Sequence, residues 1–564
     1  MLDCVAMRLI PARLWAMAIL SGLLQILPFP IAGPVPIWRT FLCWIALAPL
    51  LKSLIGEDAR GKRLGILQGA TLGYASGVVW YLGNCYWIYP TMHAYGGLSK
   101  PVAAGILVLF CLYLGLYHAL FGALIATFRR IGWLGAQGTL LLSPFAWVAA
   151  ELARARITGL PWDLLGIAQV DNPLLTGLAP FTGAYGISFV IAAVNALWLM
   201  RFSLKERRYT RPIMTVVGVG VILLYVGFLR HLNGRASENT AAIATLVQEN
   251  IEVGAANKGP ELTEAEKLRA YSELSLYPRM SYCAGIPELS STRCIQVVPL
   301  GEESANIVRP AARTNLIVWP EAPNDFFESD PRFRTGVSEL AREADAPIIV
   351  GDIGIDKDSS VKRGYDLYNS ASFIAPDGSF VGRYDKMHLV PFGEYVPYKK
   401  LFFFAGDLLA DVGEFDPGKR RLVFATGGHK YGTFICYESI FGDEVREYAD
   451  MGADMLVNIS DDGWYGDTSA AWEHLNMARM RAIENHRWVL RATNTGVTAA
   501  IDPYGRVAMA APRHVMTSIR VGFNYEHDIT FYSKYGDLFA YLCGLVTMVG
   551  VGLGWRKAAA NTVE

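Results

Sequence analysis

The sequence predicts a polytopic α-helical membrane domain joined to one large α/β domain outside the cytoplasm. The chain is 52% hydrophobic with only 18% charged residues, and its mean hydropathy of +0.27 is high for a soluble protein. Eight apolar runs, seven of them before residue 231, are long enough to cross a bilayer, because about 20 helical residues span roughly 30 Å of hydrocarbon. Between the seventh and eighth runs, short β-rich segments alternate with helical patterns, which is typical of a layered α/β fold.

The eight predicted spans follow in order along the chain. They are Leu14–Ile31, Pro34–Leu51, Leu64–Gly83, Val102–Phe128, Ile131–Ala150, Asn172–Met200, Pro212–Leu229 and Leu538–Trp555. The second is the weakest, since Arg39 interrupts it near its start. The first could instead be a signal-peptide core, but Asp3 spoils a basic leader, and Pro28 and Pro30 stand where a cleavage site needs small residues.

Lysine and arginine in the short loops predict the orientation, because cytoplasmic loops carry the excess of these residues. Alternate connections are basic: Arg8, Arg13, Lys52, Arg60, Lys62, Arg63, Arg129, Arg130, Arg201, Lys205, Arg207, Arg208, Arg211, Arg556 and Lys557. The loops Ala32–Val35 and Tyr89–Ser99 carry none, whereas the loop Glu151–Asp171 departs from the pattern with Arg154 and Arg156. We therefore expect both termini in the cytoplasm and three regions: a membrane domain at 1–231, an external domain at 232–536, and a last helix with a cytoplasmic tail at 537–564.

The external domain, about 300 residues long, is large enough for one α/β unit. The predicted strands are Ala241–Val247, Leu316–Trp319, Pro347–Val350, Ser370–Ile374, Tyr431–Ile435 and Met455–Ile459. The predicted helices are Pro331–Asp345, Asp443–Met451 and Ala471–His486. Residues 278–312 break this rhythm and indicate an irregular insertion.

Eight cysteines fall into three groups. Five lie in or beside the spans, where a small apolar residue is the default interpretation: Cys4, Cys43, Cys85, Cys111 and Cys543. Cys283 and Cys294 lie in the insertion and could form a disulfide in an oxidising compartment, which stays a hypothesis. Cys436 differs from both groups, because it follows the strand Tyr431–Ile435 and precedes the helical segment Ser439–Met451.

This strand-to-helix position favours a reactive Cys436. A thiol at a helix N-terminus feels the positive end of the helix dipole, and a neighbouring ammonium group lowers its pKa further. Backbone N–H groups at such a turn can also stabilise an oxyanion. Taken alone, Cys436 could equally be a buried structural residue, Glu321 a strand-end carboxylate and Lys386 a surface charge.

Three motifs containing these residues resemble a known superfamily. They are Leu-Ile-Val-Trp-Pro-Glu at 316–321, Tyr-Asp-Lys-Met-His-Leu-Val-Pro-Phe-Gly-Glu-Tyr at 384–395, and Gly-Thr-Phe-Ile-Cys-Tyr-Glu at 432–438. The sequence resembles the carbon–nitrogen hydrolase (nitrilase) superfamily, whose members carry a Glu-Lys-Cys triad on an αββα sandwich. Eight spans around such a domain resemble its apolipoprotein N-acyltransferase branch. The resemblance implies a multi-pass protein of the bacterial inner (cytoplasmic) membrane with a nitrilase-like αββα sandwich on the periplasmic side.

The resemblance also implies a role for each residue of the motifs. Glu321 is expected to be the general base, Cys436 the nucleophile, and Lys386 the group that stabilises the tetrahedral oxyanion. Glu394 matches a second essential carboxylate, and Tyr437 and Glu438 complete the Cys-Tyr-Glu signature.

The implied reaction has two steps and needs no metal or organic cofactor. Cys436 takes an acyl chain from a phospholipid such as phosphatidylethanolamine, and the thioester passes the chain to the α-amino group of a diacylglyceryl-cysteine heading an apolipoprotein. No basic aromatic stripe suggests a nucleic-acid partner. The alternatives are a membrane-tethered amidase or nitrilase-type hydrolase, in which water attacks the thioester, and a transporter or receptor with a degenerate hydrolase domain, which the intact triad disfavours.

Two tryptophans are candidate lipid-binding residues. Trp162, in Gly-Leu-Pro-Trp at 159–162, resembles the family's Pro-Trp loop but could equally be an interfacial anchor. Trp464 matches the family's tryptophan near the acyl-binding loop. Two departures stand beside them: Asp461 replaces the usual asparagine, and no tryptophan follows Val-Gln-Glu-Asn at 247–250.

Other patterns predict no site. Gly413–Lys419 fits a phosphate-binding Gly-x4-Gly-Lys, but Arg420 replaces the Ser or Thr that would hold Mg²⁺. Asp461 and Asp462 with His474 lack a convincing metal-ligand spacing. We expect His474, His486 and Met477 to pack or cap along one helix, and His118 to make a hydrogen-bonded helix contact within its span.

Overall fold

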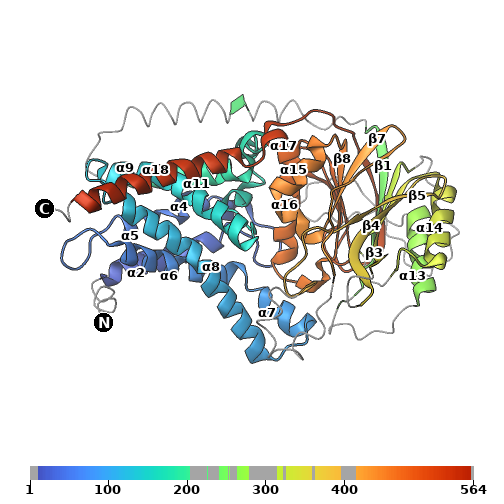
Figure 1. Ribbon diagram of the computed structural model, residues 1–564, viewed down its shortest axis with the longest axis horizontal. Helices are drawn as coiled ribbons and strands as arrows, with labels where there is room; N and C mark the ends of the chain where they lie inside the picture. Colours follow the sequence, from blue (N-terminus) through green and yellow to red (C-terminus); the bar gives the residue numbers. More distant parts are fainter. Residues whose placement is uncertain are drawn as a thin grey trace.

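The computed structural model describes residues 10–202, 225–226, 240–251, 253, 263–277, 314–321, 326–358, 363–395 and 415–560. Apart from residues 225–226, the predicted span Pro212–Leu229 lies outside these ranges, as do the insertion 278–312 and its two cysteines. Figure 1 shows two lobes, a bundle of helices next to an α/β domain.

The helical lobe covers seven of the eight predicted spans. Its helices are α2 (Ala12–Ile26), α3 (Ile37–Thr40), α4 (Cys43–Ala46), α5 (Ala48–Leu54), α6 (Ile66–Asn84), α7 (Ile88–Pro90), α8 (Lys100–Phe128), α9 (Gly135–Ala153), α10 (Pro173–Thr176), α11 (Ala179–Phe202) and α18 (Leu538–Ala560). Short π-helices lie at Thr91–Tyr95 (η1) and Arg154–Thr158 (η2), and a 3-10 helix at Leu165–Gln169 (η3). Within the described ranges, four stretches are long and apolar enough to cross a membrane: Ile37–Leu54, Lys100–Phe128, Ala179–Phe202 and Leu538–Trp555.

The predicted span Asn172–Met200 is not one helix, and that prediction was wrong in its first part. The Asn172 side chain caps the short helix α10 by accepting hydrogen bonds from the N–H groups of Leu174 and Leu175. Inside α11, Gly183 has a left-handed φ of 61°, so the regular helix begins only after it. A side chain at 183 would collide with the ring of Tyr532, so close packing against the α/β lobe fixes this break.

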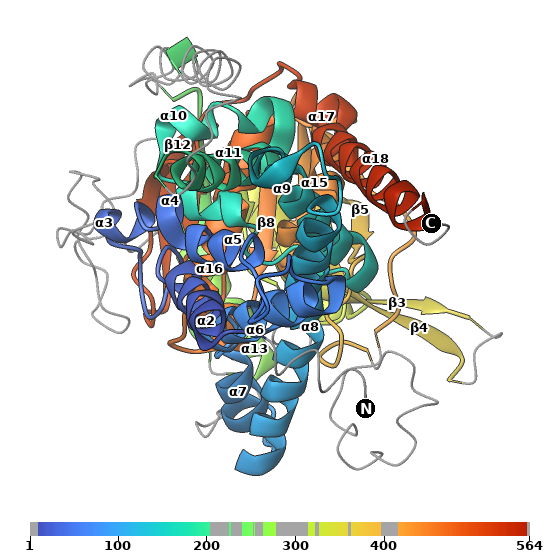
Figure 2. The ribbon, with the colours of Figure 1, turned by 90° about the vertical axis from the view of Figure 1, so that its left-hand side faces the viewer.

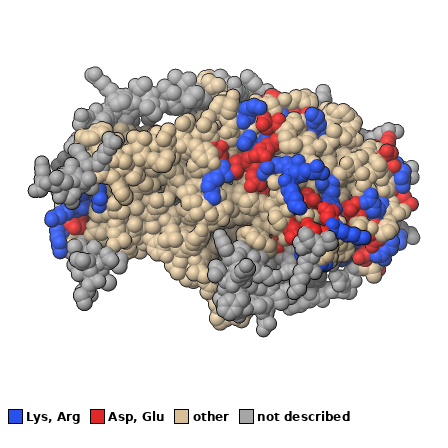
Figure 3. Space-filling model, viewed as in Figure 1, with Lys and Arg blue, Asp and Glu red and all other residues tan. Residues whose placement is uncertain are grey.

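The surface of the helical lobe fits a membrane environment. Figure 3 shows a broad band without charged residues over this lobe, with Lys and Arg at its far end and in the α/β domain. The two arginines that broke the loop pattern are used inside the protein. Arg154 is buried with its guanidinium carbon 5.6 Å from the Trp80 ring centre, and Arg156 forms ion pairs with Asp443 and Asp537. Both arginines therefore have partners within the fold.

Two six-stranded sheets form the α/β lobe. The first has the order β12-β1-β2-β3-β4-β5, with β1 (Ala242–Gln248), β2 (Leu316–Val318), β3 (Ile348–Lys357), β4 (Tyr365–Ile374), β5 (Phe380–Asp385) and β12 (Thr517–Phe523). The second has the order β11-β10-β9-β8-β7-β6, with β6 (Val423–Thr426), β7 (His429–Ile435), β8 (Met455–Ser460), β9 (Val489–Thr493), β10 (Ala499–Ile501) and β11 (Val507–Ala510). In each sheet the central strands β1-β2-β3 or β7-β8-β9 are parallel, and the outer ones antiparallel.

The sheets face each other and are covered by helices on both outer sides, so the domain is an αββα sandwich (Figure 1). Side chains such as Leu246, Phe373 and Tyr431 fill the space between the sheets. Helices α13 (Glu264–Leu276) and α14 (Pro331–Ala344) cover the first sheet, and α15 (Gly442–Asp450) and α16 (Ala470–Asn485) cover the second, beside the short α17 (Phe531–Tyr535).

Helix α16 lies between the second sheet and the helical lobe (Figure 1). Figure 2 views the molecule from its helical end, with the helical lobe in front of the sandwich. Of its 16 residues, 14 are buried, so almost none of the helix surface faces solvent. Leu475 and Ala478 pack with the sheet, whereas Met480 and Ile483 pack into the core of the helical lobe. Helix α16 therefore belongs to the packing of both lobes.

Candidate active site

The carboxyl ends of several strands meet at one edge of the sandwich. Glu321 lies just beyond β2, Lys386 directly after β5, and Cys436 directly after β7. Strand β5 runs in the direction of β2 and β3, since β3–β4 and β4–β5 are both antiparallel. The topology thus brings together three residues that are up to 115 positions apart (436 − 321).

The ammonium group of Lys386 is enclosed by two carboxylates. Its Nζ lies 3.0 Å from Glu321 Oε1 and 2.8 Å from Glu394 Oε1, and the side chain is 1% exposed. Burial alone would lower the pKa of Lys386, but Glu321 and Glu394 outweigh it and hold this pKa well above its usual range. Lys386 is therefore a permanent cation at the centre of the site.

Asn369 on β4 is a site residue that sequence reasoning missed. Its side-chain amide donates to Glu321 Oε1 at 2.6 Å and to Glu394 Oε1 at 2.7 Å. Its backbone carbonyl accepts a hydrogen bond from the backbone N–H of Lys386. The same oxygens thus face both Asn369 and the lysine, which fixes the orientation of the two carboxylates. The only sequence signal was a polar residue within a β-rich run, one position before the predicted strand start at Ser370.

Cys436 sits in a sharp turn at the end of β7. Its φ of 48° lies in the left-handed region, and a 3-10 helix begins there (η8, Cys436–Ile440). Burial raises the pKa of the Cys436 thiol well above its usual value, Glu321 adds to this, and Lys386 opposes it. The resting sulfur is therefore a protonated thiol, and a base must remove its proton before it can attack.

Glu438 ties the cysteine turn to the lysine loop. One carboxylate oxygen accepts from the Tyr384 hydroxyl at 2.7 Å and from the Met387 N–H at 2.8 Å, and the other accepts from the Ile435 N–H at 2.7 Å. These donors flank Lys386 and Cys436 in the sequence. Glu438 thus holds the two loops in register, and it does so from a buried position.

The neighbour of the cysteine, Tyr437, reaches the helical lobe. Its hydroxyl donates to the Gly159 carbonyl at 3.1 Å. Three residues further on, Trp162 is buried between the lobes, where its indole N–H donates to Glu473 Oε2 at 2.7 Å. Trp162 is therefore part of the contact between the lobes and lies directly against α16.

Trp464 has a different environment. Its side chain is 44% exposed, and its carbonyl accepts a hydrogen bond from the Thr91 hydroxyl at 3.0 Å. Thr91 begins η1, in the predicted external loop Tyr89–Ser99. Trp464 thus lies in an open position where the catalytic lobe meets the helical lobe.

Asp461 is directly coupled to the triad. Its N–H donates to Glu321 Oε2 at 2.8 Å, while its side chain accepts from the Gly463 N–H and from Asn494. Burial, and then the charge of Glu321, raise the pKa of Asp461 to about 7. A carboxyl group with a raised pKa therefore stands beside the predicted base.

The structure explains Gly418, from the pattern that resembles a phosphate-binding loop, and the two histidines in and just after the helix at 470–485. The Gly418 N–H donates to the Lys386 carbonyl at 2.8 Å, and a Cβ at 418 would lie only 2.0 Å from the Asp385 carbonyl oxygen, so this glycine supports the lysine loop. His486 does not pack along α16 but ends it with a φ of 50°. His474 does more than pack: its ring contacts both Asp462 and the Cys436 carbonyl.

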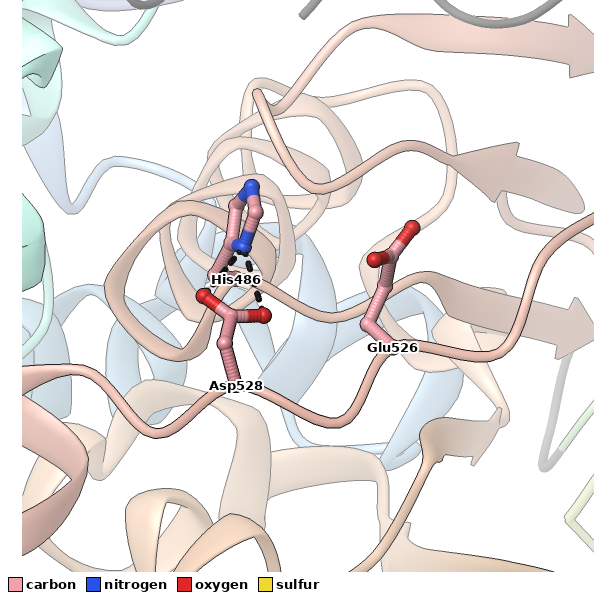
Figure 4. A group of neighbouring side chains, drawn as sticks. All are labelled: His486, Glu526 and Asp528. Atoms are coloured by element: carbon pink, nitrogen blue, oxygen red, sulfur yellow. Dashed lines mark hydrogen bonds and ion pairs between the residues drawn. The ribbon is translucent and has the colours of Figure 1, made fainter.

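Figure 4 shows the one group of potential metal ligands in the described part of the chain, His486, Glu526 and Asp528. His486 Nδ1 lies 2.7 Å from Asp528 Oδ2, and the Arg487 guanidinium lies 3.6 Å from the other oxygen of Asp528. The His486 ring and the Arg487 guanidinium thus both lie against the carboxylate of Asp528.

Comparison with known proteins gives matches over both lobes. Residues 244–520 match the family model for carbon-nitrogen hydrolase, and residues 21–197 match that for the apolipoprotein N-acyltransferase N-terminal domain. The chain is 34% identical to an apolipoprotein N-acyltransferase of Geobacter metallireducens, covering 98% of this chain and 97% of the relative. It is 29% identical to the protein of that name from Ralstonia nicotianae, covering 97% and 95%. Among solved structures, a carbon–nitrogen hydrolase superfamily protein from Xanthomonas campestris matches with 17% identity and a TM-score of 0.33, covering 50% of this chain and 89% of that one.

Proposed function

The chain belongs to the apolipoprotein N-acyltransferase family and N-acylates lipoproteins, and from this premise we propose that the acyl chain passes through a thioester on Cys436. The observation that carries the proposal is the buried Lys386 held between Glu321 and Glu394 at the strand ends that also present Cys436. A fixed cation, a carboxylate and a thiol in one enclosed place are what acyl transfer through a thioester requires.

In the first half-reaction, Glu321 accepts the Cys436 thiol proton as the sulfur attacks an ester carbonyl of a phospholipid. Lys386 stabilises the negative charge that develops on the carbonyl oxygen. When the tetrahedral intermediate collapses, the ester C–O bond breaks, Glu321 returns the proton to the departing alkoxide, and a lysophospholipid leaves. Cys436 then carries the acyl chain as a thioester.

In the second half-reaction, the acceptor is the free α-amino group of the diacylglyceryl-cysteine that heads an apolipoprotein. Glu321 takes a proton from the attacking amine, and the thioester C–S bond breaks. The proton then passes from Glu321 to the departing thiolate, so the enzyme returns to its starting state. Glu394 supports both halves by holding the charge of Lys386 in place.

The helical lobe gives this chemistry access to membrane-anchored substrates. Withdrawing acyl chains from a bilayer costs about 0.8 kcal/mol per CH₂ group, so a site at the membrane surface avoids most of that cost. We propose that the catalytic domain faces the periplasm, with both termini in the cytoplasm of a bacterial inner-membrane protein. The exposed Trp464 beside Thr91 supports a lipid-contacting role for the place where the two lobes meet. Trp162 is buried, which supports a role in holding this part of the site in position.

The decisive experiment is to incubate the purified full-length protein with phosphatidylethanolamine and look for an acyl adduct on the peptide that contains Cys436. Cys436→Ala should form no adduct. Cys543→Ala removes another buried cysteine, in the last helix, and should behave like the wild type. An adduct that persists in Cys436→Ala would overturn the thioester.

A second arm tests the acceptor. A diacylated lipopeptide should discharge the wild-type adduct as an N-acylated product. Release of free fatty acid in its place would show that water is the acceptor, as in an amidase or nitrilase-type hydrolase.

A further inference from the structure

Two carboxyl groups meet where the helical lobe contacts the catalytic domain. Asp163 belongs to the loop between η2 and η3, and Glu473 lies on α16. Both side chains are fully buried, and they hydrogen-bond to each other. None of the reaction steps above uses either carboxyl group.

Each of the two carboxyl groups has one oxygen that is held by a donor from the helical lobe. The Asn84 amide donates to Asp163 Oδ2 at 2.8 Å, and the Trp162 indole N–H donates to Glu473 Oε2 at 2.7 Å. The other oxygens, Asp163 Oδ1 and Glu473 Oε1, are buried and receive no regular hydrogen bond from an N–H or O–H group of the described residues. These two oxygens are therefore available for the contact between the carboxyl groups.

A hydrogen bond between two carboxyl groups needs a proton. An ionised carboxylate is only an acceptor, so two ionised groups cannot hydrogen-bond to each other. In a buried place they would also repel each other, because no solvent screens their charges. One proton held between Asp163 and Glu473 removes both problems, since the protonated group donates to its ionised neighbour.

The groups around the pair also favour one proton over none. Burial raises the pKa of both carboxyl groups, and the charge of Asp163 raises the pKa of Glu473 further. Arg154 opposes the rise for Asp163, and its Nη2 lies 3.5 Å from the Asp163 backbone carbonyl oxygen. The Cys85 thiol and the Ser469 hydroxyl also lie near the pair, and neither adds a positive charge. Arg154 can balance one negative charge, which is the charge that the pair has when it keeps one proton.

Two aromatic rings connect the pair to the nucleophile. The Trp162 ring, held by Glu473, stacks on His474 with centroids 5.8 Å apart and planes inclined by 22°. His474 Nε2 lies 3.0 Å from the Cys436 carbonyl oxygen. All four residues are buried, so a displacement of Glu473 would reach the Cys436 turn through close-packed contacts.

We propose that Asp163 and Glu473 are positioning residues that share one proton and so join the two lobes beneath the Cys436 turn. The shared proton lets a carboxyl group from each lobe pack against the other in a buried place. It keeps Trp162 against His474, which in turn supports the turn of the nucleophile. The effect on the reaction rate rests on the proposed role of Cys436, whereas the shared proton can be measured by itself.

Infrared spectroscopy of the full-length protein in detergent, at neutral pH, tests the shared proton. A protonated carboxyl group has a C=O stretching band that an ionised carboxylate lacks. The difference between the spectra of the wild type and Glu473→Gln should contain one such band, because the variant loses the group that shares the proton. The control Glu264→Gln removes an exposed carboxylate that pairs with Arg332, and it should leave the acid bands unchanged. A difference spectrum of Glu473→Gln without an acid band would overturn the proposal.

Single-turnover acylation of Cys436 tests the positioning role. The amide in Glu473→Gln can accept from Trp162 and donate to Asp163, as the protonated acid does, whereas Glu473→Ala loses both contacts. We expect Glu473→Ala to be acylated about tenfold more slowly than the wild type, and Glu473→Gln to restore the rate to within about threefold. Equal losses in the two variants, or a wild-type rate in Glu473→Ala, would overturn the positioning role.

The two measurements separate this inference from the proposed thioester. A failure of the thioester would appear as an acyl adduct that persists in Cys436→Ala, whereas the infrared result depends neither on acyl transfer nor on Cys436. The infrared comparison with Glu473→Gln also covers the case in which Glu473→Ala does not fold.

Discussion

At the scale of single residues, two carboxylate oxygens in the site each contact both Lys386 and Asn369. Glu321 Oε1 faces both Lys386 and Asn369, and Glu394 Oε1 faces the same two groups. Glu321, Lys386 and Cys436 could be singled out in the sequence because each sits in a short motif. Asn369 could not, since its role comes from the register of β4 beside β5, which no local pattern specifies.

Replacement of Glu394 tests this sharing of charge. In Glu394→Gln, Lys386 would pair with Glu321 alone, which stabilises the anionic form of Glu321 and makes it a weaker base. We expect normal folding and a fall in the acylation rate of Cys436 by about 10- to 100-fold, or about 1.4–2.7 kcal/mol in the barrier. Single-turnover acylation measures this. The control variant Glu328→Gln removes a carboxylate that pairs with Arg334, and its Cys436 should be acylated at the wild-type rate. Equal acylation rates in the two variants would show that Glu394 has no part in the reaction.

Asp461 gives a prediction about pH and stability. Its pKa is raised from an ordinary 3.8 to about 7 in the folded protein, so the folded state holds this proton more tightly than the unfolded state does. The wild type therefore loses stability as pH rises from about 4 to about 7 and loses no more from this group above that.

The variant Asp461→Asn has no carboxyl group at this position, so it should not lose stability over this pH range. Its free energy of unfolding should match the wild type near pH 4 and exceed it by about 2–4 kcal/mol at pH 7 and above. Denaturant unfolding in detergent at several pH values measures the difference. A gap that is constant with pH would show that Asp461 does not titrate between pH 4 and 7.

At the scale of elements, the strands predicted from the sequence are those that form short, mostly apolar runs without a charged residue. The six predicted strands correspond to β1–β4, β7 and β8. Strand β5, Phe-Val-Gly-Arg-Tyr-Asp, was missed because Gly382 and Arg383 interrupt its apolar pattern, and β9 because Arg491 stands in its middle. Arg491 is tolerated there only because Asp462, 29 positions away (491 − 462), neutralises it.

The segment 415–418 gives a prediction at this scale. It supports the lysine loop from outside, since Phe415 donates to the Glu394 carbonyl and Gly418 to that of Lys386. Gly418→Ala would push a methyl group against the Asp385 carbonyl, 2.0 Å away, and so displace β5 from the site. We expect a loss of at least tenfold in Cys436 acylation together with about 1–3 kcal/mol of stability. Gly105→Ala, in open space on α8, is the control; wild-type acylation in Gly418→Ala would contradict this close approach.

At the scale of the whole molecule, Arg156, which departs from the loop-charge pattern, forms a contact between the two lobes. Arg156 leaves the helical lobe to pair with Asp443 at the start of α15 and with Asp537 just before α18. The rule counts arginines without regard to their partners, so it could not predict this use of the residue.

Replacement of Arg156 tests how firmly the lobes are joined. In Arg156→Gln the Asp537 carboxylate, which is 3% exposed, keeps its burial but loses its cation. We expect a fall of about 2–4 kcal/mol in the free energy of unfolding and faster protease cleavage near residue 537. Arg332→Gln breaks ion pairs at a side chain that is 78% exposed and should change the stability far less. Similar losses in the two variants would show that Arg156 does not fasten the lobes.

The shared helix α16 also has a consequence for biogenesis. The chain order places α18 after the α/β domain, so the sandwich is synthesised before the last helix of the helical lobe is available. With 14 of its 16 residues buried between sheet and bundle, α16 would be uncovered on one side if the domain were expressed by itself. The enzyme is therefore not a soluble hydrolase carried on a detachable anchor. Insertion of its final helix completes the folding of the whole chain, and premature termination before that helix should leave a product that quality-control proteases remove.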